Sequence, residues 1–322
     1  MRIGLIGAGA VAGYHAHAAH ELGIDLAAVC DVSTAAAKAI APVGARIFDD
    51  YREMYASDSI DAVIVNTPHA LHTPMAIDAA EAGLHVLVEK PMAISLDACD
   101  RMREAAATAS TTLMVGHIQH YMPDKLAAAA AIAEGAIGEP TLLRDYRTTD
   151  YRPGTRSEWF FSKAVAGGGA LMNIGAHCVD RTLWLAASTA RSVSATVMNR
   201  YDVDVETDGI ITLQLQSGAT ASITVVSDAP EYSDELVIVG EQGVIIADPI
   251  TGTRVRIDGQ TRMLWEPDSD PIQQAFTAEL SDFAAAVGGQ QPAVSLYHAR
   301  HVIEVVLAAY DSAEAHEAVT LP

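Results

Sequence analysis

The sequence predicts an α/β protein of two domains, spanning residues 1–118 and 119–322. In the first domain, short apolar runs alternate with helical stretches, which is typical of a parallel sheet with helices on both faces. In the second domain, several apolar runs follow one another across short turns that contain glycine, which is typical of antiparallel strands. We therefore expect an N-terminal parallel sheet and a C-terminal α+β domain with a large open, mostly antiparallel sheet.

The elements expected in the N-terminal domain alternate along the chain. Strands are expected at 2–7, 24–31, 61–68, 84–91 and 111–116, and helices at 11–22, 33–41, 70–82 and 95–109. Each strand is a short apolar run rich in branched residues, and each helix is longer and rich in alanine. Successive parallel strands need such helical crossovers, so the alternation supports a parallel sheet.

The C-terminal domain follows a different order. Helices are expected at 123–135, 169–186, 271–287 and 295–316, and strands at 141–149, 191–201, 207–216, 219–227, 234–240, 243–248, 252–257 and 260–265. Turn residues such as Ser217-Gly218 and Asp258-Gly259 separate the strands. Strands so closely spaced favour hairpins, with the helices on one face of the sheet.

Composition limits the kinds of partner. The net charge of −21 disfavours nucleic acid and anionic membrane surfaces, because both would be repelled. Half of the residues are apolar, but no run is long enough to span a bilayer. The three cysteines lie far apart in the chain, which favours reduced, buried thiols. Since the N-terminus also shows no signal-peptide pattern, we expect a cytoplasmic protein.

The first turn carries a glycine motif between a strand and a helix, Gly7-Ala8-Gly9-Ala10-Val11-Ala12. Gly7 allows a tight turn, Gly9 lets the backbone approach a pyrophosphate, and Ala12 keeps helix and strand close. Asp31 ends the second expected strand, where a carboxylate accepts hydrogen bonds from ribose hydroxyls and repels the additional phosphate of NADP. The pattern predicts a Rossmann domain that binds NAD in preference to NADP.

A polar stripe marks the helix expected at 169–186, which follows three glycines at 167–169. Asn173, His177 and Asp180 recur at i, i+4 and i+7, and apolar residues cover most of the remaining circumference. A buried polar stripe must find hydrogen-bond partners or face a wet cavity. One interpretation is a core histidine satisfied by its neighbours. The other is a functional site that the glycine-rich segment allows to come close to another group.

Five stretches together match the motifs of a known family. They are GLIGAGAVA (4–12), NTPHALH (66–72), VEKPMA (88–93), GAIGEP (135–140) and GGGALMNIGAHCVD (167–180). With them the sequence resembles the Gfo/Idh/MocA family of oxidoreductases along essentially its whole length. Members typically join a Rossmann domain to an open-sheet α/β domain. They commonly oxidise or reduce sugars, cyclitols or related polyols with NAD or NADP, and many form dimers or tetramers through the open sheet.

The resemblance implies roles for individual residues. Lys90 would lie beside the nicotinamide and bind the reacting oxygen, Glu89 would orient Lys90, and His177 corresponds to the catalytic histidine. Asn173 joins Lys90 and His177 in the expected catalytic set, at a position where many relatives have Asp and others Asn. His69 replaces a more usual Asn. The expected cofactor-binding residues are Gly7, Gly9, Ala10, Val11, Asp31, Thr67, Pro68, His69, His72, Glu89 and Lys90. The expected substrate-binding residues are His117, His120, Tyr151, Asn173 and His177.

The chemistry of alcohol oxidation suits these residue types. An ammonium group such as that of Lys90 stabilises a developing alkoxide. The ordinary pKa of a histidine side chain, about 6.5, suits a base that removes the hydroxyl proton near neutral pH. The sequence thus predicts an NAD-dependent dehydrogenase of a small polyol, without a metal. The resemblance implies that it forms a homodimer or homotetramer through the C-terminal sheet. A dinucleotide-binding sensor without catalysis and an NAD-dependent glycosidase are the alternatives.

Overall fold

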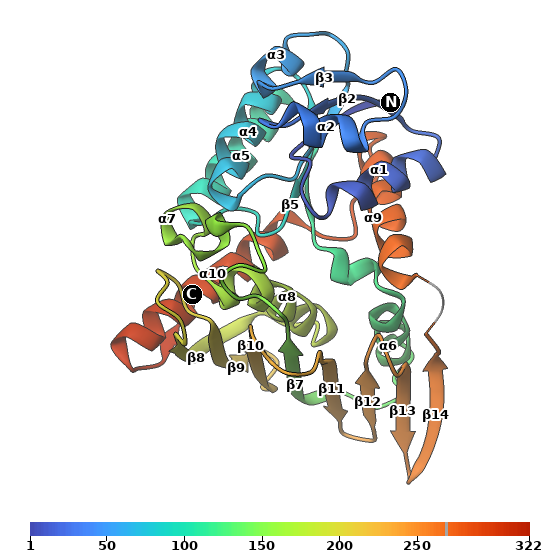
Figure 1. Cartoon of the computed structure of the whole chain (residues 1–322). Coiled ribbons are helices and arrows are strands. Elements are labelled where there is room, and N and C mark those ends of the chain that lie inside the picture. The colour runs from blue at the N-terminus through green and yellow to red at the C-terminus, as the bar shows by residue number, and fades with distance from the viewer. Residues whose placement is uncertain (268–269) are drawn as a thin grey trace. The chain divides into compact units, whose positions relative to one another are not determined.

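The computed structural model describes residues 1–267 and 270–322, shown in Figure 1. The described chain divides into two compact units. The first comprises Met1–Tyr121 and Ile272–Arg300, and the second comprises Met122–Pro271 and His301–Pro322. The chain first leaves the N-terminal unit close to the expected boundary at residue 118. The observed division differs from the expected one because Ile272–Arg300 belongs to the first unit.

The first unit is built on a six-stranded parallel sheet of order β3-β2-β1-β4-β5-β6. Its strands are β1 (Arg2–Ile6), β2 (Asp25–Cys30), β3 (Arg46–Phe48), β4 (Ala62–Val65), β5 (His85–Glu89) and β6 (Leu113–Gly116). Residues of β4 are buried on both faces, as expected for a central parallel strand. The strand order reverses between β1 and β4, and dinucleotides bind at such a switch point. The predicted Rossmann topology is confirmed.

Helices pack on both faces of this sheet, with α4 and α5 on one side and α1 on the other (Figure 1). They are α1 (Ala12–Glu21), α2 (Thr34–Ile40), α3 (Tyr51–Tyr55), α4 (His69–Glu81), α5 (Leu96–Ala109) and the 3₁₀ turn η1 (Ile118–Tyr121). Side chains of Ser33, Asp50 and Ser95 accept backbone N–H bonds at the starts of α2, α3 and α5, which fixes where these helices begin. The sequence did not predict β3 and α3, because such short elements show no clear periodicity.

Helix α9 (Pro271–Val287) joins the first unit although it follows the strands of the second in sequence. Its apolar face buries Phe276, and the Phe276 ring stacks on Tyr14 of α1 with centroids 5.0 Å apart. The Gln273 side chain also donates a hydrogen bond to the Tyr14 carbonyl oxygen at 3.2 Å. These contacts explain why a division of the sequence at one point does not describe the two units.

The second unit contains a nine-stranded sheet of order β14-β13-β12-β11-β7-β10-β9-β8-β15. Its neighbouring strands are antiparallel except for the parallel pair β7 and β10, so the predicted mostly antiparallel sheet is confirmed. The strands are β7 (Pro140–Thr148), β8 (Ala190–Met198), β9 (Asp208–Leu215), β10 (Thr220–Val226), β11 (Asp234–Gly240), β12 (Val244–Ala247), β13 (Thr253–Ile257), β14 (Gln260–Trp265) and β15 (Val319–Thr320).

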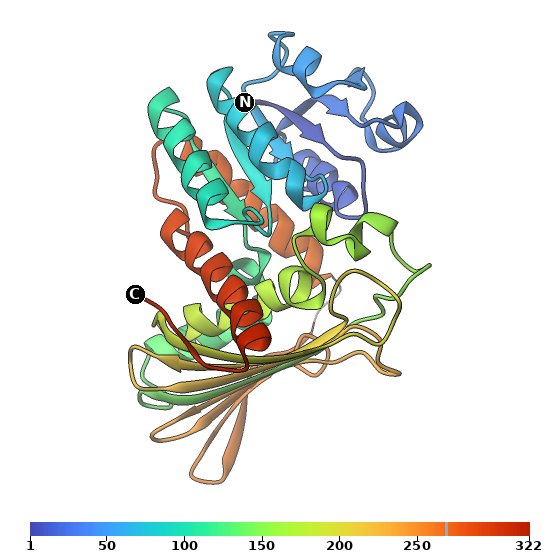
Figure 2. The same cartoon turned by 90° about the vertical axis from the view of Figure 1, so that its left-hand side faces the viewer.

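Helices of the second unit cover one face of this sheet, and Figure 2 shows the sheet edge-on below them. They are α6 (Pro123–Ala133), α7 (Lys163–Ala166), α8 (Ala176–Leu185) and most of α10 (Leu296–Ala315), together with the 3₁₀ turn η2 (Glu158–Phe161) and the π-helix η3 (Leu171–Gly175). Strand residues alternate between buried and partly exposed positions, as expected for a sheet covered on one face. Large exposed apolar side chains include Leu142, Met198, Ile210 and Met263 on its strands.

A buried ion network ties α8 to the sheet. Arg181 of α8 is fully buried, and its guanidinium donates two hydrogen bonds to Asp145 of β7 at 2.6 Å. A third nitrogen of Arg181 lies 2.5 Å from Asp234 of β11. Burial alone would raise the pKa of Asp234, but the charges of Arg147 and Arg181 outweigh it and hold that pKa well below its usual value. The network fixes the helix that carries His177.

The composition predicted reduced, buried cysteines and no segment long enough to span a bilayer. Cys30, Cys99 and Cys178 are free and buried, and burial raises the pKa of both Cys30 and Cys99 to about 12. These thiols are therefore protonated near neutral pH. Within the described ranges, no helix combines the length and the apolar character needed to cross a membrane.

Candidate functional site

The glycine turn after β1 has the geometry that a pyrophosphate requires. Gly7 has a φ of +91°, and a Cβ added there would come 2.1 Å from the Asn66 carbonyl oxygen, so only glycine fits. By contrast, a Cβ at Gly9 would meet nothing within 4 Å, which leaves room for a ligand close to the backbone. Helix α1 then begins at Ala12 without a side-chain cap at Val11, so its N-terminal dipole remains available to an anion.

Asp31 lies directly after β2 and beside this turn. Its Oδ2 accepts a hydrogen bond from the Ala8 N–H at 2.8 Å, and its Oδ1 accepts one from the Ser33 N–H at 2.7 Å. These bonds fix the carboxylate against the glycine turn and leave lone pairs on both oxygens. The arrangement fits the adenosine ribose of NAD, and a 2′-phosphate would bring a second negative charge next to the carboxylate.

The segment after β4 contains the expected cofactor residues Thr67, Pro68, His69 and His72. Helix α4 begins at His69, and both His69 and His72 are buried. The two ring nitrogens of His72 lie 2.9 Å from the Pro91 carbonyl oxygen and 2.8 Å from the Thr67 carbonyl oxygen. The His72 side chain therefore links the two segments that flank it. Its expected contact with the cofactor stays a prediction.

The segment after β5 carries Glu89, Lys90 and Pro91, with a cis peptide bond between Lys90 and Pro91. The Glu89 carboxylate lies 2.8 Å from His15 Nε2 and accepts a hydrogen bond from the Lys90 N–H at 3.3 Å. Burial alone would raise the pKa of Glu89, but the hydrogen bond and charge of His15 outweigh it and lower that pKa. Glu89 is thus an anion held between α1 and the Lys90 backbone. Its expected function of orienting the Lys90 side chain stays a prediction.

His15 was not among the residues expected at the site. It lies on α1 with His17, whose side chain is exposed, whereas His15 is 1% exposed. Spacing along α1 alone does not distinguish them, because the partner of His15 comes from a different element. The Glu279 side chain of α9 lies near His15 and Glu89, so the buried cluster combines three elements of the first unit.

The segment after β6 carries His117 and His120, both buried. Their rings pack edge-on against His298, with centroids 6.1 Å and 5.3 Å away, respectively. Both residues follow β6 in the first unit. Because the strands of this sheet are parallel, His117 and His120 lie at the same edge of the sheet as Gly7 and Lys90, which follow β1 and β5. Their expected contact with substrate stays a prediction.

The helix expected at 169–186 consists of two elements, the π-helix η3 and α8. A π-turn places hydrogen bonds between residues five apart, so the alignment of Asn173 with His177 differs from that in a regular α-helix. Asn173 and His177 are 7% and 9% exposed, and Asp180 is fully buried. Such π-turns occur frequently at functional sites. The polar residues are buried together on one short segment of the second unit.

The glycines before this helix approach other parts of the protein. A Cβ at Gly168 would come 2.1 Å from the Tyr310 hydroxyl oxygen, and one at Gly169 would come 1.9 Å from the Glu206 carbonyl oxygen. The sequence therefore indicated a close approach correctly. The groups approached are Glu206 and Tyr310, within the same unit.

Glu206 and Tyr310 cap the start of the helix. The Glu206 carboxylate accepts hydrogen bonds from the N–H groups of Gly169 and Leu171 and from the Tyr310 hydroxyl, at 2.8–2.9 Å. The Ala170 N–H donates to the Glu206 carbonyl oxygen, and the Met172 N–H donates to the Tyr310 oxygen. Four successive N–H groups, which a helix start normally leaves unpaired, are thus satisfied. Burial raises the pKa of Glu206 in spite of these donors.

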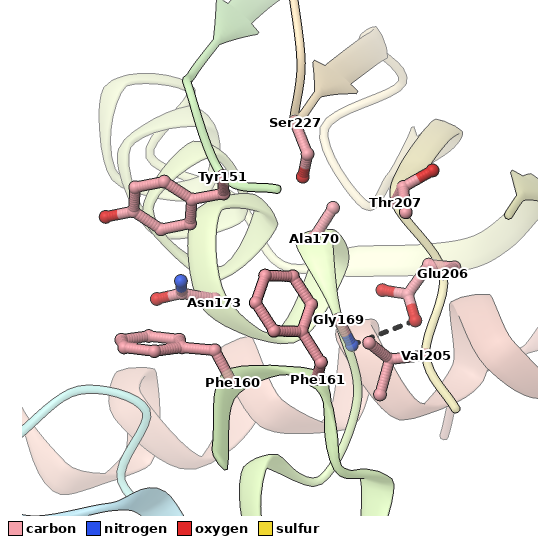
Figure 3. Close-up of a pocket in the computed structure, with 10 residues that line it drawn as sticks. All are labelled: Tyr151, Phe160, Phe161, Gly169, Ala170, Asn173, Val205, Glu206, Thr207 and Ser227. Atoms are coloured by element: carbon pink, nitrogen blue, oxygen red, sulfur yellow. Dashed lines mark hydrogen bonds between the residues drawn. The ribbon is translucent and has the colours of Figure 1, made fainter. Parts of the chain in front are cut away.

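A cavity adjoins Asn173 in the second unit (Figure 3). Tyr151, expected at the substrate site, lies on one side of the Asn173 amide and Phe160 lies on the other (Figure 3). The Tyr151 and Phe160 rings pack edge to face with centroids 5.9 Å apart. The residues that line it are Tyr151, Phe160, Phe161, Gly169, Ala170, Asn173, Val205, Glu206, Thr207 and Ser227. Of these, Tyr151 and Asn173 were expected at the substrate site, and Gly169 and Ala170 lie in the motif at 167–180. The others carry no motif that marks them.

The structure thus defines a dinucleotide-binding unit joined to a second unit with a cavity beside a polar π-turn. Residues 1–117 match the model of the "Oxidoreductase family, NAD-binding Rossmann fold", and residues 126–246 match that of the "GFO/IDH/MocA C-terminal domain". The chain belongs to the GFO/IDH/MocA family of oxidoreductases, and its cofactor is NAD. As a member it is an NAD(P)-dependent enzyme that acts on CH–OH groups.

Individual relatives agree with this assignment. An inositol 2-dehydrogenase of Rubrobacter xylanophilus is 31% identical over 80% of this chain and 74% of its own length. A D-xylose 1-dehydrogenase (NADP(+)) of Haloferax volcanii is 29% identical over 85% of this chain and 84% of its own. Among solved structures, GenD2 from gentamicin A biosynthesis, in complex with NAD, superposes with a TM-score of 0.90 at 26% identity, covering 100% of this chain and 96% of that one.

Proposed function

We propose that the protein transfers a hydride between NAD and a secondary alcohol or ketone of a sugar, cyclitol or related polyol. The observation that carries this proposal is the position of Lys90. It follows β5 at the carboxyl edge of the sheet, the edge at which the glycine turn and Asp31 form the dinucleotide site. The names of the relatives, inositol 2-dehydrogenase and D-xylose 1-dehydrogenase, support an alcohol of this class.

The nicotinamide, when bound, accepts or donates the hydride. The Lys90 ammonium binds the reacting oxygen and stabilises the negative charge that develops as the proton leaves. The Glu89 carboxylate accepts a hydrogen bond from the Lys90 N–H. Because Glu89 is itself held by His15, this bond keeps the turn after β5 in place. His177, on the helix fixed by Arg181, removes the hydroxyl proton in oxidation and returns it in reduction. Asn173 supplies a neutral hydrogen-bonding group beside the substrate.

A substrate panel tests the proposed function. Purified protein is mixed with NAD and inositols, aldoses or related polyols, and NADH formation is followed. Turnover with at least one member is expected. NAD binding without turnover of any member would instead favour a dinucleotide sensor, and release of a sugar from a glycoside without net NADH would favour a glycosidase.

The role of Lys90 is tested with the best substrate from that panel. Lys90→Met should lower kcat by about two to four decades and leave NAD affinity nearly unchanged, because lysine acts on the reacting oxygen. Lys38→Met serves as the control, since Lys38 is exposed on α2 of the same unit. Turnover of Lys90→Met within a few-fold of wild type would remove Lys90 from the mechanism.

We further propose a homodimer or homotetramer formed through the sheet of the second unit, and a cytoplasmic location. Exposed Leu142, Met198, Ile210 and Met263 on the strands support an interface, and buried free thiols support a reducing compartment. Sedimentation of wild type and Ile210→Asp tests the interface. If Ile210→Asp forms the same oligomer as wild type, the interface lies on a different surface.

A further inference from the structure

The cavity beside Asn173 is small and mostly apolar. The rings of Phe160 and Phe161 and the side chain of Val205 form its apolar walls (Figure 3). Its unfilled space holds about two water-sized groups. That space is too small for a sugar ring. It fits one substituent of a ring, with a carbon atom against the aromatic walls.

Ser227 contributes a polar group to this space. Ser227 is 4% exposed, and its hydroxyl points into the cavity (Figure 3). Its backbone is fully engaged, because the N–H donates to Thr207 O and the carbonyl oxygen accepts from Tyr151 N–H at 2.6 Å. The hydroxyl of Thr207, by contrast, bonds to Asp208 and to Arg200 N–H. Ser227 Oγ can therefore bind a ligand hydroxyl that enters the cavity.

The charge of the cavity disfavours an anion. Glu206 lines it, and its carboxylate accepts three hydrogen bonds. None of the ten residues that line the cavity is a lysine or an arginine. Arg156 stacks on the Tyr151 ring, 4.2 Å from its centroid, but is not among the lining residues. A carboxylate placed in the cavity would face a buried acid and apolar walls without a cation, which is costly.

We propose that this cavity is the subsite for an uncharged hydroxymethyl group on the ring of the substrate. The methylene carbon packs against Phe160 and Phe161, and the hydroxyl bonds to Ser227 Oγ. The subsite selects a hexose ring over the matching pentose, which lacks this group, and over the matching hexuronate, which carries a carboxylate in its place. The inference rests on the proposed dehydrogenase function and specifies its substrate.

Sugars that differ only at this substituent test the subsite. D-glucose, D-xylose and D-glucuronate form one series, and D-galactose, L-arabinose and D-galacturonate form a second. Burying one methylene and forming one hydrogen bond should raise kcat/KM for the hexose about 10- to 50-fold over the pentose. The hexuronate should rank below the pentose. Equal values for hexose and pentose, a preferred hexuronate, or turnover of inositols alone would overturn the subsite but leave the dehydrogenase function standing.

Variants of Ser227 separate binding from folding. Ser227→Ala should lower kcat/KM for the hexose about three- to tenfold and leave that for the pentose within twofold. Ser227→Val should fill the space and reduce the hexose preference further. Ser217→Ala is the matched control, because it removes an exposed hydroxyl from the turn between β9 and β10 of the same unit. A parallel loss for both sugars in Ser227→Ala would mean a structural role and would overturn the proposal. If no sugar is turned over although NAD binds, the proposed dehydrogenase function is refuted, and the subsite proposal is refuted with it.

Discussion

Glu206 offers a direct test of how the glycine segment is held. In Glu206→Ala, the N–H groups of Gly169 and Leu171 and the hydroxyl of Tyr310 lose their common acceptor. A buried donor left unpaired costs about 1–3 kcal/mol, and water entering the space recovers part of it, so about 3–5 kcal/mol of destabilisation is expected. Glu206→Gln keeps one acceptor oxygen but turns an NH₂ group toward a donor, so about 1–3 kcal/mol is expected.

Urea unfolding followed by tryptophan fluorescence measures this cost. All three tryptophans, at 159, 184 and 265, lie in the second unit, so their emission reports the unit that contains Glu206. Glu231→Gln is the control, because Glu231 is exposed in the same unit. The expected order of stability is wild type, then Glu206→Gln, then Glu206→Ala. Equal stability of wild type and Glu206→Ala would refute the capping role.

The pH dependence adds a second readout. Burial raises the pKa of Glu206 in the folded protein. A raised folded-state pKa gives stability that is fully present below the unfolded pKa and is lost as the pH rises through the folded value. The cost of Glu206→Gln should therefore be greatest near or below the ordinary glutamate pKa and smaller at pH 8. A cost that grows with pH would contradict the burial of this carboxylate.

Three further predictions concern single side chains. Asp31→Ser should raise NADP affinity relative to NAD about tenfold in titrations, because a charge next to the 2′-phosphate is removed; unchanged selectivity would contradict the role of Asp31. His15→Gln should lower kcat about ten- to hundredfold with NAD affinity retained, since Lys90 loses its support, whereas exposed His17→Gln should not. Asp234 has a lowered pKa, so its stabilising contribution is present above pH ~4 and is lost as the pH falls further. Asp234→Asn should accordingly flatten the acid side of the stability profile; an unchanged slope would contradict the ion network.

The sequence predicted the parts of the fold that depend on local patterns. The alternation of runs before residue 118 gave the parallel sheet, and the glycine motif at 7–12 located its first turn. Helix α9 could not be assigned to the first unit, because its contacts with Tyr14 join residues more than 250 positions apart. Periodicity reports which face of a helix is apolar, but not which sheet it packs on.

The sequence singles out candidate site residues where the residue type itself carries the chemistry. Lys90, Asp31 and His177 stand out because their charge or titration suits a dehydrogenase. The cavity residues Phe160, Phe161 and Ser227 do not, because aromatic residues and serines occur throughout a folded protein and only proximity gives them a role. The partners of Gly168 and Gly169 also escaped prediction, since Glu206 and Tyr310 come from distant segments.

The relation between Asn173 and His177 can be tested through pH. If His177 is the base, alcohol oxidation falls as the pH drops and the imidazole becomes protonated. Asn173→Asp places a carboxylate on the π-turn next to α8. A nearby negative charge favours the imidazolium, so the acid limb of kcat/KM should move to higher pH by about one unit or more. Because the π-turn changes the angle between the two residues, the size of this shift measures how directly they face each other.

Controls make that shift interpretable. Asn199→Asp adds the same charge at an exposed position of the second unit, so its profile should match wild type. His177→Ala should abolish the acid limb together with most of the activity. If the limb moves equally in Asn173→Asp and Asn199→Asp, the effect is one of overall charge. If His177→Ala keeps both activity and profile, His177 is a core histidine satisfied by its neighbours, and the proton acceptor is a different group.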